Sequence, residues 1–375
     1  MSSARKVLVV GAGTAGTTLA IFLRRAGIEV EIVEIRPDWD ISGSGITLQG
    51  AALRVLRDAG VYDEVLARGY AFDDLGMRTP DGTVLARFPA PRTGGDDLPA
   101  TVGTNRPDLA RVLTDAALAA GAVGRLGLTV DVLKETDAGV DATFSDGTTG
   151  TYDLVVGADG IRSHIRELIG VPERPEPNGM AIWRVHARRP QELTFTEFAY
   201  GGPAFIAGYC PTGPDTMYAY LVERARDRAD VTPETMSERM MGLARAYGGL
   251  WELFRDDIAD AGRLNHTLFE SLLVQGPWNR GRVVLVGDAV HACPPTLALG
   301  AAMGLEDAAV LAELLTTRRE WDQDLFDAYT ARRFERVRTV VEGSLQLCTW
   351  LMENSPDADV PGLMGRVGAL VSRPA

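Results

Sequence analysis

Lys6-Val7-Leu8-Val9-Val10, followed directly by Gly11-Ala12-Gly13-Thr14-Ala15-Gly16, is the stretch of sequence that decides the fold. After Lys6 the run is apolar and rich in β-branched residues, which is typical of a strand buried in a parallel sheet. Residues 17–25 then carry apolar side chains at helical spacing, and residues 29–34 form a second strand that ends on Glu34. This strand–helix–strand unit predicts a Rossmann-type nucleotide-binding fold.

The glycines of this unit have separate physical tasks. Gly11 permits a tight turn, Gly13 lets the backbone approach a pyrophosphate, and Gly16 allows the helix to pack closely on the strand. The helix N-terminus offers free N–H groups to the phosphates, and Glu34 can bind the adenosine ribose hydroxyls. We therefore predict that the adenosine half of a dinucleotide contacts Gly11, Gly13, Thr14, Ala15, Gly16, Glu34 and Arg36. The alternative is a glycine turn that binds no nucleotide.

Length and charge exclude several classes of protein. The chain has 375 residues, 46% of them hydrophobic, and a formal net charge of -13. This length suits two joined domains rather than one small core. The negative charge argues against binding to nucleic acid, which needs a basic face, and against docking on anionic membranes.

Cysteine and histidine usage points to a reducing compartment and to no metal. Cys210, Cys293 and Cys348 have no paired spacing, which fits a cytosolic protein better than a disulfide scaffold. The histidines add no metal-binding motif, so we expect no metal site. Residues 1–6 lead straight into the first strand, and no apolar run reaches the ~18 residues that a membrane span needs. We therefore expect no secretory signal and a cytoplasmic location.

Periodicity along the rest of the chain predicts further helices and strands. We expect helices over residues 50–69, 105–121, 233–247, 300–315 and 324–351. A hairpin is expected over 77–88, and single strands over 128–133, 140–144, 152–156 and 282–286. Three prolines between 172 and 177 are typical of a linker. Short aromatic strands then follow, near 182–183, 195–198, 205–209 and 217–222, and they predict an antiparallel sheet.

Two later segments decide which dinucleotide is bound. Residues 153–163 read Asp-Leu-Val-Val-Gly-Ala-Asp-Gly-Ile-Arg-Ser, and residues 281–291 read Gly-Arg-Val-Val-Leu-Val-Gly-Asp-Ala-Val-His. With the first glycine motif, and from residue 6 to about 345, the chain resembles the group A flavoprotein monooxygenases, the family of p-hydroxybenzoate, salicylate and 6-hydroxynicotinate hydroxylases. The resemblance implies FAD as cofactor, with NAD(P)H and O₂ as co-substrates. No second GxGxxG follows a strand, so NAD(P)H has no domain of its own.

The resemblance also implies roles for single residues. Gly287-Asp288 matches the motif whose carboxylate hydrogen-bonds a ribityl hydroxyl. Asp159 matches a segment near FAD that serves NAD(P)H docking, and Arg106 matches an arginine that approaches the ribityl–pyrophosphate stretch. Each has a structural alternative, since Asp159 and Asp288 could cap helices or turns and Arg106 could form a surface salt bridge.

The loop after Asp288 departs from the family pattern, in which Pro and Gly-Gln-Gly precede an Asn. Pro295, Gly300 and Ala301 keep a helix N-terminus that can face the flavin pyrimidine and stabilise its reduced anion. Ala298 and Ala302 replace the first glycine and the asparagine.

On this basis we expect an α/β fold with a Rossmann-type FAD-binding domain built on a parallel sheet, an inserted antiparallel-sheet substrate domain and C-terminal helices. The FAD-binding domain is predicted to be discontinuous, over residues 1–72, 99–175 and 276–345. The substrate domain takes residues 73–98 and 176–275, and a C-terminal helical segment covers 346–375.

Substrate contacts are expected from the inserted sheet and from residues 44–47. Thr47 stands where the 6-hydroxynicotinate hydroxylases carry a histidine, which argues against that substrate. Arg184 shares one face of a strand with His186, and it could anchor a substrate carboxylate or face solvent. Tyr209 and Tyr220 could contact substrate or fill the core of the sheet.

No catalytic base stands out from the sequence. Arg184, Tyr218 and His291 are candidates, and for His291 the alternative is packing beside the flavin motif. The predicted reaction is hydroxylation of a small aromatic or heteroaromatic compound through a flavin hydroperoxide, as the resemblance implies. The alternatives are a flavin monooxygenase that acts on a polyketide or antibiotic, and a non-catalytic flavin-binding protein. The oligomeric state stays open.

Overall fold

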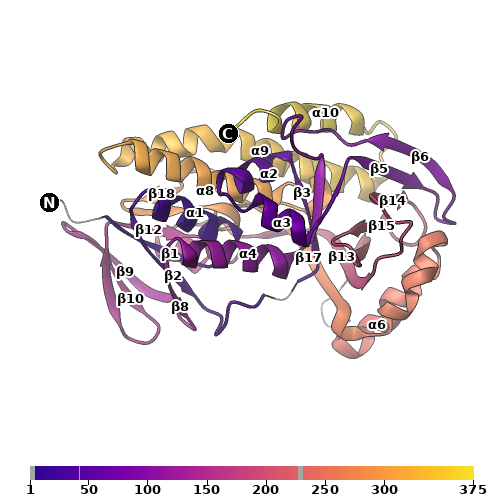
Figure 1. Cartoon of the computed structure of the whole chain (residues 1–375), viewed down its shortest axis with the longest axis horizontal. Helices are drawn as coiled ribbons and strands as arrows, with labels where there is room; N and C mark the ends of the chain where they lie inside the picture. Colours follow the sequence, from indigo (N-terminus) through magenta and orange to yellow (C-terminus); the bar gives the residue numbers. More distant parts are fainter. Residues whose placement is uncertain (1–4, 42, 227–230) are drawn as a thin grey trace.

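Two lobes lie side by side in the molecule, and long helices extend over both (Figure 1). The computed structural model describes residues 5–41, 43–226 and 231–375. The first four residues, which entered the expectation about a secretory signal, lie outside this range. Within it, no helix combines the length and apolar character needed to cross a membrane.

The first lobe is built on the parallel sheet that the sequence predicts. β1 (Lys6–Val10) pairs in parallel with β2 (Glu29–Glu34) on one side and with β12 (Leu154–Gly157) on the other. The strand order is β18-β19-β12-β1-β2-β8, with the remaining bounds Asn279–Arg280 for β18, Val283–Leu285 for β19 and Val123–Leu126 for β8. β1 belongs at the centre of this sheet because Val7 to Val9 are fully buried and present apolar side chains on both faces.

Helices and a small sheet cover the parallel sheet. α1 (Thr14–Arg25) packs against α4 (Arg106–Ala119) and α8 (Gly300–Thr317). A three-stranded antiparallel sheet packs against β1 and β12, and it consists of β9 (Val130–Thr136), β10 (Gly139–Phe144) and β11 (Thr149–Tyr152). The short helix α5 (His164–Leu168) follows β12.

The second lobe is an eight-stranded sheet of order β20-β17-β13-β16-β15-β14-β5-β6. Every neighbouring pair is antiparallel except β14 and β5. The bounds are Asp74–Arg78 for β5, Val84–Pro89 for β6, Glu176–Arg188 for β13, Thr196–Tyr200 for β14, Ile206–Pro211 for β15, Thr216–Arg224 for β16, Leu264–Leu273 for β17 and His291–Ala292 for β20. α6 (Pro233–Ala244), α7 (Arg255–Ile258) and a 3₁₀ turn over residues 249–254 pack on one face of this sheet.

A third group of elements joins the lobes. β3 (Gly45–Gln49), β7 (Thr101–Asn105) and β4 (Tyr70–Phe72) form a small antiparallel sheet, beside α2 (Gly50–Asp58) and α3 (Tyr62–Arg68). α9 (Gln323–Glu353) contacts α8 in the first lobe and β13 and β17 in the second, and α10 (Val360–Val371) packs on α9. In Figure 1 these two helices run along the upper edge of the molecule.

The predicted fold class is confirmed, but several element boundaries were wrong. The helix expected over 50–69 is two helices, because Gly60 adopts a left-handed conformation (φ 65°) that ends the first. The proline stretch near 172–177 is not only a linker, since β13 begins inside it at Glu176. β17 was missed, because LNHTLFESLL shows no strict alternation. The division of the chain into domains stays a prediction, and its boundary at 345/346 falls inside the continuous helix α9.

Candidate active site

The glycine loop between β1 and α1 has the geometry that close approach of a phosphate requires. Gly11 has a φ of 105°, and a Cβ atom there would lie 2.4 Å from the Ala158 carbonyl oxygen. α1 begins with Gly13 as its N-cap, without a capping side chain or an acidic residue in its first turn. Because the first N–H groups of a helix have no intrahelical acceptor, this N-terminus can receive an anion. Thr14, Ala15 and Gly16 form that first turn.

Glu34 lies next to this loop at the end of β2. Its Oε2 accepts a hydrogen bond of 2.9 Å from the Ala12 N–H, and its Oε1 accepts one of 3.1 Å from the Arg36 guanidinium. The carboxyl group is only 7% exposed. Oε1 also accepts from the Arg36 backbone N–H at 3.1 Å, whereas Oε2 accepts one hydrogen bond and so can still accept another from a ribose hydroxyl.

Among the buried oxygens that have no hydrogen-bond partner in the described residues, two belong to Asp159 and Asn105, close in sequence to the predicted cofactor residues. Asp159 Oδ2 accepts from the Ile165 N–H at 3.0 Å, so Asp159 does act at a helix start, but its Oδ1 is unpaired. Burial raises the pKa of Asp159. The second orphan is Oδ1 of Asn105, the residue before Arg106. Buried polar atoms without a partner are rare in proteins, and one explanation is a ligand that supplies the bond.

Asp288 and Arg106 lie near enough for the charge of Arg106 to affect the pKa of Asp288. Asp288 can be reached by solvent yet lies deep among protein atoms, as a residue that lines a cavity does. Burial raises the pKa of Asp288, and the positive charges of His291 and Arg106 oppose that rise. Arg106 is exposed and forms no ion pair with a described acid, so the surface salt bridge considered for it is absent from this part of the chain.

Asp307, in α8, has hydrogen-bond partners on both of its carboxyl oxygens. Its Oδ2 accepts from the Gly287 N–H at 2.9 Å and contacts His291 Nε2 at 2.5 Å, while Oδ1 accepts from Arg333 Nε at 2.7 Å. The charges of His291 and Arg333 outweigh burial and hold the pKa of Asp307 below its ordinary value. His291 is 2% exposed and occupied by this ion pair, so the structure supports the packing role for it and not the catalytic one.

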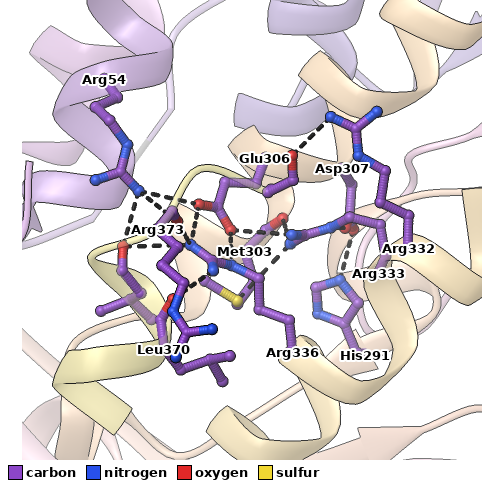
Figure 2. A network of polar contacts seen from close by, with 12 residues as sticks. Arg54, His291, Met303, Glu306, Asp307, Arg332, Arg333, Arg336, Leu370 and Arg373 are labelled. Atoms are coloured by element: carbon purple, nitrogen blue, oxygen red, sulfur yellow. Dashed lines mark hydrogen bonds and ion pairs between the residues drawn. The ribbon is translucent and has the colours of Figure 1, made fainter.

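Figure 2 shows that this ion pair belongs to a larger buried network. Arg333 also donates to Glu306, and Arg336 donates to both carboxyl oxygens of Glu306. Arg336 and Arg54 then bond carbonyl oxygens at the end of α10, on residues 370, 371 and 373. The network therefore ties the backbone of the Gly287-Asp288 turn, through α8 and α9, to the C-terminal helix.

The loop from Pro294 to Gly300 has alanine at a position with left-handed backbone geometry. Ala298 has φ 54° and ψ 33°, the left-handed conformation that glycine adopts at no steric cost. Gly300 then starts α8, whose N-cap, Leu299, has no capping side chain, and Ala301 follows in the first turn. Pro295 is exposed at the start of the loop. The uncapped N-terminus expected to face the flavin is thus present.

Arg184 lies on the face of the eight-stranded sheet that is turned away from α6. It is 9% exposed, and its guanidinium donates to Thr267 Oγ1 at 3.0 Å. No other hydrogen bond and no ion pair joins this side chain to a residue in the described part of the chain. Burial, and in second place the positive charge of Arg106, lower the pKa of Arg184 to about 10. The solvent-facing alternative for Arg184 was therefore wrong.

Tyr218, Tyr220 and Cys210 share this face with Arg184. The register pairs Arg184 with Tyr220 and pairs Tyr218 with Cys210. Thr47 on β3 completes the group, with its hydroxyl 3.3 Å from Tyr218 Oη and 3.9 Å from Cys210 Sγ. β3 can lie this close because position 45 is glycine, where a Cβ would meet the Tyr218 ring at 2.0 Å.

The hydroxyl and thiol groups of this cluster are neutral at neutral pH. Burial raises the pKa of Tyr218 to about 12 and the pKa of Cys210 to about 11, and it raises the pKa of Tyr220 well above its ordinary value. Cys210 is therefore a thiol rather than a nucleophilic thiolate. Tyr218 can donate a hydrogen bond to an anionic oxygen.

Tyr209 does not belong to this cluster. It precedes Cys210 on β15 and so points to the opposite face, where its ring packs 6.0 Å from Phe254 and 6.4 Å from Trp251. The structure thus gives Tyr209 a core position and contradicts the idea that it contacts substrate. His186, on the Arg184 face, donates from Nε2 to the Gly43 carbonyl at 2.9 Å and so holds the loop before β3.

Sequence reasoning missed three residues of the site. Cys210 was interpreted only as an unpaired cysteine, although alternation along β15 separates it from Tyr209. Thr267 lies on the strand that was not predicted. Asp307 was quoted in the motif after Gly300 without a role, because its partners Arg333 and His291 are distant in sequence.

A dinucleotide fits the first lobe, and a cluster suited to an aromatic compound lies on the facing sheet. An unblocked glycine loop and an uncapped helix suit the pyrophosphate of FAD, and a buried acid at the end of β2 suits its adenosine ribose. The unpaired oxygens on Asp159 and Asn105 are acceptors and suit hydroxyl groups of such a ligand. The carboxyl group of Asp288, which bonds to no described residue, can accept hydrogen bonds from hydroxyl groups. These features are those of a flavin-dependent oxidoreductase.

The chain belongs to the FAD binding domain family, which matches residues 4–344. It is 33% identical to the 2-heptyl-3-hydroxy-4(1H)-quinolone synthase of Pseudomonas aeruginosa, over 88% of this chain and 86% of the relative. It is 30% identical to the 6-hydroxynicotinate 3-monooxygenase of Pseudomonas fluorescens, over 94% of both chains. The crystal structure of Klebsiella pneumoniae HpxO complexed with FAD and uric acid has the same fold, with a TM-score of 0.84 and 20% identity over 100% of this chain and 98% of that one. The chain is an FAD-dependent monooxygenase of a family that uses NAD(P)H and acts on aromatic and heteroaromatic compounds.

Proposed function

We propose that this enzyme hydroxylates an aromatic or heteroaromatic ring that carries an anionic oxygen, and that Arg184 binds this oxygen. The observation that carries the proposal is the state of Arg184, a buried guanidinium whose hydrogen bond to Thr267 leaves its other donors without a described partner. A buried cation is costly unless an anion or several acceptors compensate it. A substrate oxyanion or carboxylate would supply that compensation.

The relatives support a ring of this kind. One is named for a quinolone and another for 6-hydroxynicotinate, and both names describe nitrogen heterocycles with oxygen substituents. HpxO was crystallised with uric acid, which is again a heterocycle rich in oxygen. Thr47 replaces a histidine of the 6-hydroxynicotinate hydroxylases, so we propose a different ring for this chain.

We further propose which residues hold the cofactor. The Gly11–Gly16 loop and the start of α1 would bind the pyrophosphate, and Glu34, with Arg36 beside it, the adenosine ribose. Arg106 and Asp288 would contact the ribityl chain, with Asp159 nearby. Gly287 and Pro295 would flank the flavin ring, and the helix start at Gly300 and Ala301 would face its pyrimidine edge. When bound, FAD would supply the redox chemistry of the reaction, since it can be reduced by NAD(P)H and can activate O₂.

The chain's own residues then prepare the substrate. The positive charge of Arg184 favours the deprotonated form of a ring hydroxyl and so makes the ring richer in electrons. Neutral Tyr218 donates a hydrogen bond to the same oxygen, and Thr47 fixes the direction of the Tyr218 hydroxyl. The burial of Arg184 and Tyr218 strengthens these polar interactions, because the surroundings screen charge less than water does. No protein base is needed if Arg184 holds the substrate as an anion.

The proposal is tested with purified, FAD-loaded enzyme. A panel of phenols, hydroxypyridines and hydroxyquinolines is screened for stimulated NADH or NADPH oxidation and for mass gain from ¹⁸O₂. We expect Arg184→Met to lower kcat/KM for the active compound about 100-fold or more, because it removes a buried charged contact. The matched control is Arg188→Met, at an exposed position on the same face of β13, and it should leave kcat/KM unchanged. If no compound gains an oxygen atom, or if both variants behave alike, the proposal is wrong.

A further inference from the structure

A large cleft opens between the second lobe and the C-terminal helices. Its volume is about 720 Å³, within the range typical of sites for small molecules. One wall is the turn from β14 to β15, residues 200–206, together with residues 223–226 at the end of β16. The opposite wall is the end of α9 and the segment that leads to α10, and Thr296 of the loop before α8 lies between the walls.

The lining of this cleft is mainly apolar in its interior. Phe205 and Ile206 come from the sheet lobe, and Leu347, Trp350 and Leu351 come from α9. Each of these side chains contributes to a hydrophobic cluster of the protein, and all but Leu347 retain part of their surface exposed. Charged groups gather where β16 ends. Glu223 is paired with Arg226 and bonded to Trp183, and Arg224 donates to the Met352 carbonyl at 3.5 Å. The cleft therefore suits a hydrocarbon group better than a second anion.

The strand β15 links this cleft to the Arg184 face of the sheet, because Ile206 lines the cleft and Cys210 of the same strand lies beside Tyr218. Ile206, Gly208 and Cys210 alternate along β15 and so point to one face, with Tyr220 lying over Gly208. Tyr220 contacts Tyr218 at a ring separation of 5.7 Å. The path from Cys210 to Ile206 covers four residues, or roughly 13 Å of strand. Thr296, which contacts the cleft, is one residue from Pro295 in the loop assigned to the flavin.

We propose that this cleft is a second binding subsite, which holds an apolar extension of the substrate, such as an alkyl chain or a further ring, while its oxygenated ring lies at Arg184. The inference rests on the proposed function, because it takes the position of the ring from it. A single small ring reaches only the Arg184 cluster. A substrate that fills both parts must extend along β15 past Tyr220, with its polar end at Arg184 and its apolar end against α9.

The test uses 4-alkylphenols with chains from methyl to nonyl as probes. Binding to the FAD-loaded enzyme is measured by calorimetry, and hydroxylation is followed separately by product mass. We expect the affinity to rise about threefold to fourfold for each added methylene until the cleft is filled, as burial of apolar surface requires. A chain-length series with constant affinity would overturn the proposal.

Substitutions in the lining show whether the dependence of affinity on chain length arises in the cleft. Ala358 lines the cleft outside the catalytic cluster, so Ala358→Trp should fill it and weaken binding of the longest probe at least tenfold, with 4-methylphenol unaffected. Ser355→Trp gives a second variant that fills the cleft if the first does not fold. The control is Ala138→Trp, in the exposed turn between β9 and β10, which should bind the whole series as the unmodified enzyme does. A folded Ala358→Trp or Ser355→Trp variant that keeps the full dependence on chain length would contradict the assignment of the cleft.

The two proposals fail in different ways. Chain-length-dependent binding without an oxygenated product would leave the cleft in place and remove phenol hydroxylation as its purpose. Oxygenation of 4-methylphenol without any effect of chain length would support the proposed function and remove the cleft subsite.

Discussion

Arg333 and Arg184 are both buried arginines, but the protein treats them in opposite ways. Arg333 is fully buried and donates to Asp307, Glu306 and the Met303 carbonyl. Those two carboxylates raise its pKa above the ordinary value despite burial. Arg184 has a threonine hydroxyl as its acceptor, and burial lowers its pKa to about 10.

The contrast teaches how to separate structural from functional charge in this fold. A buried ion pair stabilises only when its hydrogen bonds are complete, and the network around Arg333 meets that condition. Arg184 has one neutral acceptor, and its other donors are free to bind an anionic ligand. The same contrast distinguishes Asp307 from Asp288. Asp307 accepts hydrogen bonds from three groups, whereas Asp288 is bonded to none of the described residues.

The largest expected effect comes from breaking the saturated network. Arg333→Met would leave Asp307 and Glu306 short of a buried cation, and we expect the free energy of unfolding to fall by about 3–5 kcal/mol. Arg184→Met removes a charge without an anionic partner, so its free energy of unfolding should change by less than about 1 kcal/mol. Urea unfolding of both variants, followed by circular dichroism, measures the difference. Equal destabilisation by the two substitutions would contradict the contrast.

The Arg184 cluster, through Tyr218, and the Arg333 network, through Asp307, should lose their contributions to stability at opposite extremes of pH. The pKa of Tyr218 is raised to about 12 in the folded protein, so its contribution is fully present below the unfolded pKa near 10 and is lost as the pH rises toward 12. The lowered pKa of Asp307 has the opposite consequence, and its contribution is present above the unfolded pKa near 3.8 and is lost on acidification.

Tyr218→Phe tests the predicted loss of folding stability at high pH. It should reduce the loss of stability between pH 10 and 12 by ~2 kcal/mol, because the phenol no longer ionises. Unfolding free energies measured at pH 7, 10 and 12 compare the variant with the unmodified enzyme. An unchanged alkaline slope would mean that burial of Tyr218 does not control its ionisation.

The sequence predicted those parts of the molecule that depend on local patterns. Gly11 to Gly16 and Glu34 belong to one strand–helix–strand unit, so their proximity follows from a single short segment. Predictions from such local patterns gave the family, the parallel sheet and FAD as the cofactor, and all three were confirmed. The residues assigned to FAD stay a prediction, although the structure brings Arg106 near Asp288 as the resemblance implies.

The substrate face could not be predicted in the same way, because β15 and β16 are buried on both faces. Their sequences therefore show no alternation between polar and apolar residues, and nothing in the sequence separates Tyr209 from Tyr218. His291 was ambiguous for another reason. Its partner Asp307 lies 16 residues away on a helix that folds back beside it, and only tertiary packing reveals the ion pair.

A smaller effect, on FAD binding, is expected from substitution of Asp288, whose carboxyl group bonds to no described residue. Asp288→Asn keeps the shape of the side chain and removes the charge of a carboxylate that we assign to a ribityl hydroxyl, so the FAD affinity should fall about tenfold. The stability of the FAD-free protein should not decrease, because no described residue bonds to Asp288. Fluorescence titration of the FAD-free protein with FAD measures the affinity, and Asp141→Asn, on an exposed strand position, is the control. A variant that binds FAD normally would remove Asp288 from the cofactor site.

The smallest effect concerns Ala298, in the loop between His291 of the saturated network and the start of α8. Alanine in a left-handed conformation costs about 1 kcal/mol relative to glycine, while glycine gains more entropy in the unfolded chain. Ala298→Gly should therefore raise the free energy of unfolding by only ~0.5 kcal/mol. Ala302→Gly should lower it by ~1 kcal/mol, because Ala302 is buried in the first turn of α8, where glycine weakens a helix. The opposite signs, measured by urea unfolding, distinguish backbone strain at one position from helix stability four residues later. Two changes of the same sign would show that the loop does not hold Ala298 in the left-handed conformation in solution.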